Sequence, residues 1–279
     1  MRLRIIDAFT DRPFSGNPAG VMLLDAFPDD QRLQRIAAEV NLSETAFAHP
    51  LEPGGHPLEP GGEADWALRW FTPLREVDLC GHATLATAHA LTSDGRVAPG
   101  GGPLRFATRS GVLTAAPNAD GGHTLDFPTA PLTEEPLPEG LAEALGAVPL
   151  SVHDTGPHCG DLLLELPDEK TVRELEPDHR ALARHSRRGI IATAPADDPA
   201  AGYDFVSRGF FPQVGIDEDP VTGSAHTALA PYWTARLGRD RLTGFQGGAR
   251  TGIVRTEVRG DRTLLTGDAV TVLDGELLV

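Results

Sequence analysis

The stretch RWFTPLREVDLCGHATLATAHA, residues 69–90, decides how this chain is organised, because a second version of it, RGFFPQVGIDEDPVTGSAHTA, occupies residues 208–228. The corresponding positions, at one constant offset close to half of the chain length, are Arg69 with Arg208, Phe71 with Phe210, Pro73 with Pro212, Val77 with Ile216, Asp78 with Asp217 and Cys80 with Asp219. After a slip of two residues, GHA at 81–83 meets GSA at 223–225. The repetition predicts two copies of one structural unit.

An upstream echo supports the duplication. GNPAGVMLL at residues 16–24 parallels GPHCGDLLL at residues 156–164. A Pro-rich stretch at residues 128–138 marks the expected boundary between the copies. We therefore expect an N-terminal domain of residues 1–127 and a C-terminal domain of residues 128–263.

The composition indicates a globular protein with an acidic surface. The 279 residues are 40% hydrophobic, which allows an ample core, and the net charge of −16 argues against a nucleic-acid or anionic-membrane partner. No run approaches the length of a membrane span, and the first residues lack the apolar segment of a signal peptide. Cys80 and Cys159 make neither a disulfide framework nor a zinc set, so we expect a cytoplasmic protein with reduced thiols.

Turn signals and apolar spacing predict more strands than helices. Asp29 is placed to cap a helix whose apolar residues follow at helical spacing. Each half holds one apolar helix after its Gly-x-Ala sequence, at residues 83–91 and 225–237, and residues 104–113 fit a single strand. Hairpin turns outnumber βαβ crossovers, which predicts an α+β fold rather than a doubly wound sheet.

The heptad HPLEPGG is written twice in tandem at residues 49–62. Repetition this rich in proline and glycine cannot pack a core, so we predict an exposed hairpin extension. Its histidines, His49 and His56, are expected to be solvated rather than to bind a metal.

The two repeat junctions are the places where chemistry is expected. In each, a strand ends and a helix begins at Gly-x-Ala, and Gly81 and Gly223 permit close approach to the N–H groups of a helix N-terminus, which attract anions. Two related units would bring these helix starts to face each other across an inter-domain cleft, where both grip one carboxylate-bearing small molecule. The alternative is two tight turns without function; recurrence with polar residues at matching positions favours the functional interpretation.

Candidate proton-transfer residues surround these junctions. Cys80 and Asp219 hold equivalent positions just before the turns, and His82 and Asp219 are natural acid–base or hydrogen-bonding groups. Ser224 is a natural donor to a carboxylate. Glu44 has no counterpart in the second half, where the aligned residues are apolar, and an acid that breaks the repeat suggests a specialised role. The alternative is a surface carboxylate at a helix end.

The chain resembles the PhzF family of phenazine-biosynthesis-like isomerases, which share the diaminopimelate epimerase fold. The matching stretches, in order along nearly the whole chain, are FSGNPAG at 14–20, NLSETAF at 41–47, DLCGHAT at 78–84 and EDPVTGSA at 218–225. The resemblance implies two pseudo-symmetric domains, each a bent, barrel-like mixed β-sheet around a central helix. It also implies that a C-terminal strand, at about residues 264–279, returns to the first domain, and that the protein forms a homodimer.

The resemblance also assigns roles. It implies Glu44 as the acid/base that shuttles a proton, with His82 and Asp219 positioning the substrate or assisting the transfer, and Cys80 as a secondary candidate. The residues implied to contact the substrate are Ser43, Gly81, Gly223 and Ser224. The characterised family reaction isomerises trans-2,3-dihydro-3-hydroxyanthranilate by moving a proton across a conjugated ring, with no metal or organic cofactor.

Two other functions stay open. Racemases and epimerases of this fold use a cysteine at each junction, and here Cys80 keeps one while Asp219 holds the second position. A thiol and a carboxylate are a poorly matched pair for removing an α-proton from opposite faces. A binding protein that keeps the carboxylate cradle without turnover is the other alternative, and the joint presence of Glu44, His82 and Asp219 argues against it. Residues 246–252, QGGARTG, are only a loose version of the family's Gln-Gly…Arg-Gly-Gly segment.

Overall fold

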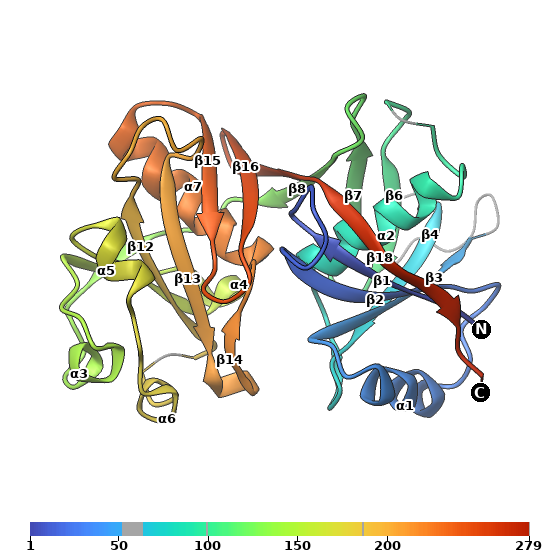
Figure 1. Ribbon diagram of the computed structural model, residues 1–279, viewed down its shortest axis with the longest axis horizontal. Helices are drawn as coiled ribbons and strands as arrows, with labels where there is room; N and C mark the ends of the chain where they lie inside the picture. Colours follow the sequence, from blue (N-terminus) through green and yellow to red (C-terminus); the bar gives the residue numbers. More distant parts are fainter. Residues whose placement is uncertain (52–63, 99, 186, 279) are drawn as a thin grey trace. The chain divides into compact units, whose positions relative to one another are not determined.

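The computed structural model describes residues 1–51, 64–98, 100–185 and 187–278. The chain forms two compact units, Met1–Asp126 with Thr266–Val279, and Phe127–Leu265. Most of the predicted hairpin extension at residues 49–62 lies outside the described residues. Each unit is a set of strands around one longer helix (Figure 1).

The first unit is a mixed sheet packed on helix α2 (Gly81–Ser93). Antiparallel pairs join β18 to β1 and β1 to β2, a parallel pair joins β2 to β3, and an antiparallel pair joins β3 to β4. Strand β4 then runs parallel to β6, which continues antiparallel into β7 and β8. The strands are β1 (Arg2–Ala8), β2 (Asn17–Leu23), β3 (Glu44–Pro50), β4 (Trp66–Phe71), β5 (Glu76–Val77), β6 (Leu104–Thr108), β7 (Gly111–Pro117), β8 (His123–Pro128) and β18 (Ala269–Glu276).

The single strand predicted over residues 104–113 is wrong, because this segment is the β6–β7 hairpin. Gly111 has a positive φ of 89°, and the Thr108 hydroxyl donates to the Gly111 carbonyl at 2.7 Å. A left-handed glycine and a hydroxyl that bonds to the turn backbone reverse the chain where a single strand was predicted.

Helix α1 (Asp30–Val40) begins after the predicted cap Asp29 and is followed by β3. The Asp29 carboxylate accepts a hydrogen bond from the Arg32 N–H at 3.0 Å, as a helix N-cap does. At the other end, Asn41 adopts the left-handed conformation with φ of 53°, which ends the helix and turns the chain toward Glu44.

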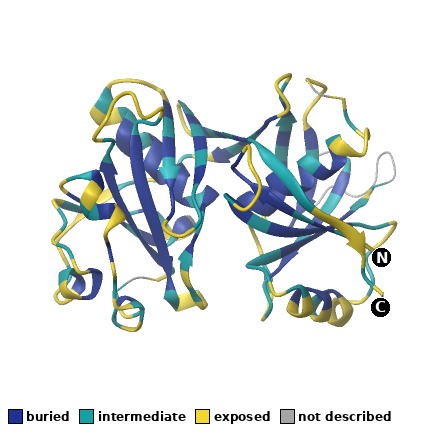
Figure 2. Cartoon of the chain, viewed as in Figure 1, coloured by how far each residue is buried: buried dark blue, intermediate teal, exposed yellow. Residues whose placement is uncertain are grey.

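Helix α2 is buried on nearly every side. Ten of its 13 residues are buried, most of them alanine, threonine or glycine, and small side chains let strands approach closely. The hydroxyls of Thr84 and Thr87 donate to the carbonyls four residues earlier, at 2.6 and 2.7 Å, so their burial leaves no donor unsatisfied. Figure 2 shows this helix among buried strands, whereas α1 exposes its outer face.

The second unit is also a mixed sheet, packed on helix α7 (Gly223–Leu237). Its pairs are antiparallel for β9–β10 and β10–β11, parallel for β11–β12, antiparallel for β12–β13, parallel for β13–β15 and antiparallel for β15–β16. The strands are β9 (Thr133–Glu135), β10 (Ser151–Asp154), β11 (Asp161–Glu165), β12 (Gly189–Pro195), β13 (Phe205–Phe211), β14 (Ile216–Asp219), β15 (Arg241–Gln246), β16 (Gly252–Arg259) and β17 (Arg262–Gly267). The shorter helices are α3 (Leu141–Leu145), α4 (Gly156–Cys159), α5 (Glu169–Arg173), α6 (His179–Leu182) and the 3₁₀ turn η1 (Pro212–Val214).

The prediction of an α+β fold with mixed sheets and few helices is confirmed. Nine of the 15 residues of α7 are buried, with Tyr232 and Trp233 among the large side chains of that core. Among the described residues, no helix combines the length and apolar character needed to cross a membrane.

Candidate active site

Glu44 and His82 meet in the first unit. Glu44 opens β3, opposite Ala19 of β2, and His82 is the second residue of α2. The His82 Nε2 lies 3.4 Å from the Glu44 Oε2, with side chains only 6% and 13% exposed. The structure therefore brings together two residues that are far apart in sequence and that were both predicted to take part in proton transfer.

The other nitrogen of the His82 ring faces two further groups. The Asn17 Nδ2 lies 3.2 Å from the His82 Nδ1, and the Cys80 Sγ lies 3.5 Å from the same atom. An amide N–H from Asn17 makes Nδ1 an acceptor and leaves the ring proton on Nε2, the nitrogen near Glu44. Burial lowers the pKa of His82 to about 3, so the ring is a neutral imidazole at neutral pH.

Glu44, Cys80 and His82 form the acid–base cluster. One potential ligand atom of each lies within 4.8 Å of the others, in the single such group found among the described residues. Carboxylate, thiolate and neutral imidazole are all zinc ligands, so this cluster has the donor types to hold a divalent ion of that kind. The same groups serve proton transfer, which was the role predicted for them.

Ser43 and Gly81 lie beside the cluster in sequence. The Ser43 Oγ is buried and makes no hydrogen bond within the described residues. Gly81 is the first residue of α2, where backbone N–H groups have no partner inside the helix. Both positions suit donation to a ligand.

In the second unit, Asp219 is held at the end of β14. The Thr222 hydroxyl donates to the Asp219 Oδ2 at 2.6 Å. The Gln246 side chain accepts from the Thr222 N–H at 2.9 Å and donates to the Asp219 carbonyl at 3.2 Å. Gly223 and Ser224 then begin α7, so β15 and α7 together fix the turn that carries three predicted site residues.

Arg188 reaches the same turn and was not singled out from the sequence. It precedes β12, and its Nε and Nη2 donate to the two carboxylate oxygens of Asp161 at 2.8 and 2.5 Å. Its Nη2 also donates to the Ser224 hydroxyl at 2.9 Å. The predicted donor Ser224 is therefore coupled to an ion pair whose carboxylate is completely buried.

Sequence reasoning missed four polar residues of these two sites. Asn17 and Gln246 lie inside two motifs quoted above, FSGNPAG and QGGARTG. These motifs marked the residues as part of the family pattern, but no role was predicted for either side chain. Arg188 had no such signal, because its partners come from distant parts of the chain. The full set is Asn17, Arg188, Thr222 and Gln246. That both helix starts serve one substrate stays a prediction.

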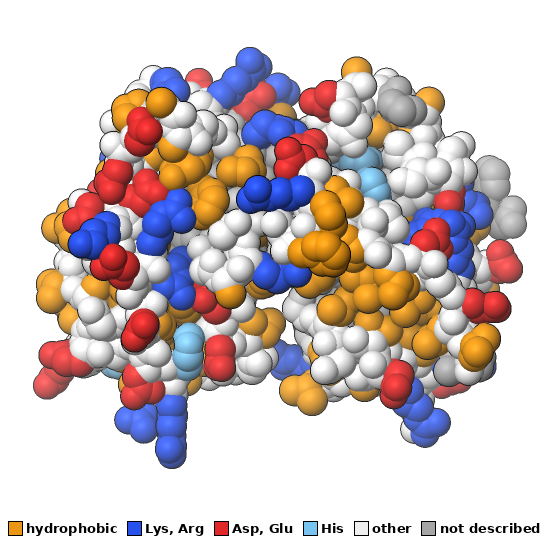
Figure 3. Space-filling view, in the orientation of Figure 1, with side chains coloured by type: hydrophobic (Ala, Val, Ile, Leu, Met, Phe, Trp, Pro, Cys, Tyr) orange, Lys and Arg blue, Asp and Glu red, His pale blue; other side chains and the backbone are white. Residues whose placement is uncertain are grey.

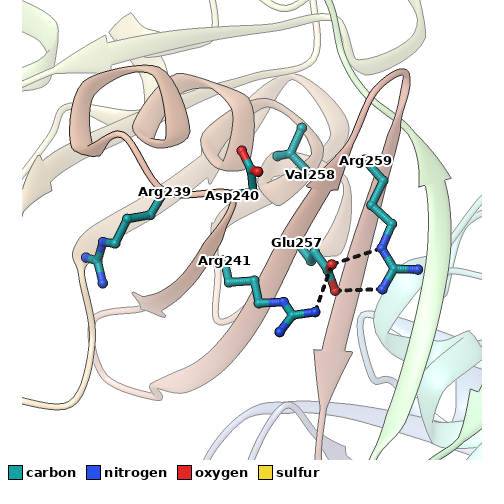
Figure 4. A pocket seen from close by; sticks show the side chains of 6 residues that line it. All are labelled: Arg239, Asp240, Arg241, Glu257, Val258 and Arg259. Atoms are coloured by element: carbon teal, nitrogen blue, oxygen red, sulfur yellow. Dashed lines mark hydrogen bonds and ion pairs between the residues drawn. The ribbon is translucent and has the colours of Figure 1, made fainter.

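A pocket of about 510 Å³ on the second unit contains none of these residues. Within it, Arg241 and Arg259 both donate to Glu257, at 3.2 and 2.9 Å, so these side chains bind one another (Figure 4). Figure 3 shows basic and acidic side chains interspersed on the visible face of this unit. We do not assign the reaction to this pocket, which is lined by Arg239, Asp240, Arg241, Glu257, Val258 and Arg259.

Residues 6–275 match the family PhzC-PhzF, described as phenazine biosynthesis-like protein. The chain belongs to this family. A relative from Pseudomonas aeruginosa, named an uncharacterised isomerase, is 48% identical over 272 residues, which cover 98% of this chain and 96% of the relative. An uncharacterised isomerase from Halalkalibacterium halodurans is 44% identical over 276 residues, covering 99% and 97%. The chain is an isomerase of the PhzF family, as predicted.

Solved structures agree with the assignment of this chain to the PhzF family. A PhzF-family protein from Enterococcus faecalis has a TM-score of 0.87 and 39% identity, covering 100% of this chain and 99% of that one. A probable proline racemase from Agrobacterium radiobacter K84 has a TM-score of 0.63 at 13% identity, covering 100% and 93%, which shows a shared fold alone. This PhzF-family chain therefore has the fold that racemases also use.

Proposed function

We propose that this PhzF-family isomerase moves a proton on a small, cyclic or conjugated, amino acid-like carboxylate, with Glu44 as the acid/base. The observation that carries the proposal is the buried contact between Glu44 and a neutral His82. The Glu44 carboxylate takes a proton from one carbon, the electrons of the broken C–H bond move through the conjugated system, and the resulting carboxylic acid returns the proton to another carbon. The step balances without a cofactor.

His82 supports this role because it is a hydrogen-bond donor without a charge. A neutral imidazole offers the Nε2–H to Glu44 or to a substrate oxygen, and it does not lock the carboxylate in an ion pair. Asn17, fully buried, fixes the ring through Nδ1. The buried hydroxyl of Ser43 is also suited to a substrate contact, because a buried hydroxyl without a hydrogen bond costs free energy that a substrate partner would recover.

We propose that Gly81, Gly223 and Ser224 donate hydrogen bonds to the substrate carboxylate and that Asp219 positions the substrate. The support is their place in the first turns of α2 and α7, where N–H groups are available. Asp219 is 7% exposed and is held by the Thr222 hydroxyl. A homodimer and a role in secondary metabolism stay predictions.

We also propose that the two units are pseudo-symmetric copies. The support is the identical succession of parallel and antiparallel pairs from β1 to β7 and from β10 to β16. In this alignment of the strand pairs, Leu162 corresponds to Gly20, because Leu162 pairs with Ile190 as Gly20 pairs with Thr45. The upstream echo in the sequence matched Gly20 to Gly160 instead, which lies two residues earlier. On the same alignment, Gly189 is the counterpart of Glu44.

One contact favours a second candidate, a racemase or epimerase that uses Cys80 and Asp219. The Cys80 Sγ lies 3.5 Å from a histidine nitrogen, and such a neighbour can activate a thiol. Replacing Cys80 with serine separates the two candidates: the racemase should lose its activity, and the Glu44 isomerase should keep most of it.

The test is turnover of trans-2,3-dihydro-3-hydroxyanthranilate in D2O, followed by NMR, for the wild type beside Glu44→Gln. Turnover with deuterium incorporation that falls by about 10²–10⁴-fold in the variant would support Glu44 as the acid/base. Equal turnover by the variant would refute that role. No turnover by the wild type would exclude this compound as the substrate.

A further inference from the structure

Arg188 is built into the second unit as a fixed cation. Both oxygens of Asp161 accept from it, and the Asp161 side chain is completely buried, so the ion pair is bidentate and shielded from water on one side. The guanidinium also lies over the Phe211 ring, 5.2 Å from its centroid. These contacts hold the guanidinium plane in one orientation.

The opposite edge of the guanidinium is available to a ligand. Its Nε and Nη2 donate to Asp161 and Ser224, whereas its Nη1 makes no hydrogen bond to any residue that the structure describes. The Arg188 side chain is 30% exposed. Two N–H donors of a permanently charged group thus remain beside the first turn of α7.

The neighbouring charges indicate which ligand fits. Arg188 and Asp161 neutralise each other, and Asp219, close enough to interact electrostatically with Arg188, adds a second carboxylate. A ligand that carries an amino group as well as a carboxylate can direct the first toward Asp219 and the second toward Arg188.

We propose that Arg188 binds the carboxylate of the substrate through its Nη1 edge and, with Asp219, selects an amino carboxylic acid. This inference rests on the proposed function, since it assigns the substrate class of the same site. The Ser224 hydroxyl, oriented by the Arg188 Nη2, binds the same carboxylate. Arg188 is therefore a specificity residue of this isomerase, and it does not exchange protons with the substrate.

The test is calorimetric binding of two stable probes, anthranilate and its neutral amide, anthranilamide. We expect Arg188→Lys, which keeps a positive charge for Asp161 but loses the planar fork, to weaken anthranilate binding at least tenfold and leave anthranilamide binding unchanged. Arg173→Lys is the matched control, because Arg173 also binds a buried carboxylate, Glu169, and a hydroxyl, Tyr203, at 2.6 and 2.9 Å, away from Ser224. It should bind both probes as the wild type does.

Two outcomes would overturn the inference. One is wild-type binding of anthranilate that is no tighter than that of anthranilamide, which decides the matter even if Arg188→Lys fails to fold. The other is unchanged anthranilate affinity in a folded Arg188→Lys protein, with folding checked by circular dichroism. Equal turnover by the wild type and Glu44→Gln in the isomerase assay would count against Glu44 chemistry and would leave this binding comparison unaffected.

Discussion

Replacing His82 with glutamine should make the first unit less sensitive to mild acid. The ordinary pKa of histidine is 6.5, and burial lowers that of His82 to about 3. Below pH 6.5 the unfolded chain therefore binds a proton at His82 that the folded chain does not bind until about pH 3. The free energy of unfolding consequently falls as the pH drops through this window. At pH 5 the loss due to His82 is about 2 kcal/mol relative to pH 8, because each pKa unit is worth about 1.4 kcal/mol.

The assay is urea unfolding of the wild type and His82→Gln at pH 8 and pH 5. The fall in the free energy of unfolding between the two pH values should be about 2 kcal/mol smaller in the variant, whatever the variant costs at pH 8. Other buried histidines, such as His123 with a pKa lowered to about 4, act equally in both proteins and cancel. Equal pH dependence of the two proteins, or an NMR titration of the His82 Cε1–H with a midpoint near 6.5, would refute the neutral imidazole.

Three further predictions concern the site and its supports. Gln246→Leu should cost about 1–3 kcal/mol in urea unfolding, because it removes the partner of the buried Thr222 N–H; the reasoning fails if stability is unchanged. Gly189→Ala should cost about 1–3 kcal/mol by overpacking against the Phe211 ring, and an unperturbed thermal midpoint would contradict this. Zn²⁺ should inhibit by binding the acid–base cluster, reversibly with EDTA, and should inhibit Cys80→Ser less; equal inhibition of both proteins would place the ion elsewhere.

The sequence was sufficient to predict features that depend on local patterns. The cap at Asp29 and the two helices after Gly-x-Ala follow from residue types at short spacing. Residues 104–113 were predicted wrongly because the apolar residues on both sides of the turn were assigned to one strand, although the dipeptide Ser110-Gly111 is a turn signal. Here a local signal was outweighed by a longer pattern.

Contacts among three separate elements were beyond sequence reasoning. The acid–base pair requires β2, β3 and α2 to pack together, and only the family resemblance implied that Glu44 and His82 share a site. Arg188 joins the start of β12 to β11 and α7. No spacing rule links positions so far apart, because the sheet register brings them together.

The missing counterpart of Glu44 determines the stereochemistry that we expect of the Glu44 isomerase. At Gly189 a side chain would overlap the Phe211 ring, so the second unit has no room for an equivalent acid. In the Glu44 isomerase one carboxylate must then both remove and return the proton, which delivers it to the same face of the substrate. Because Glu44 is only 13% exposed, we expect its proton to exchange slowly with water, so a substrate deuterated at the labile carbon should keep part of its label in the product. Product of inverted configuration carrying only solvent hydrogen would instead indicate two bases on opposite faces, as the racemase that uses Cys80 and Asp219 requires.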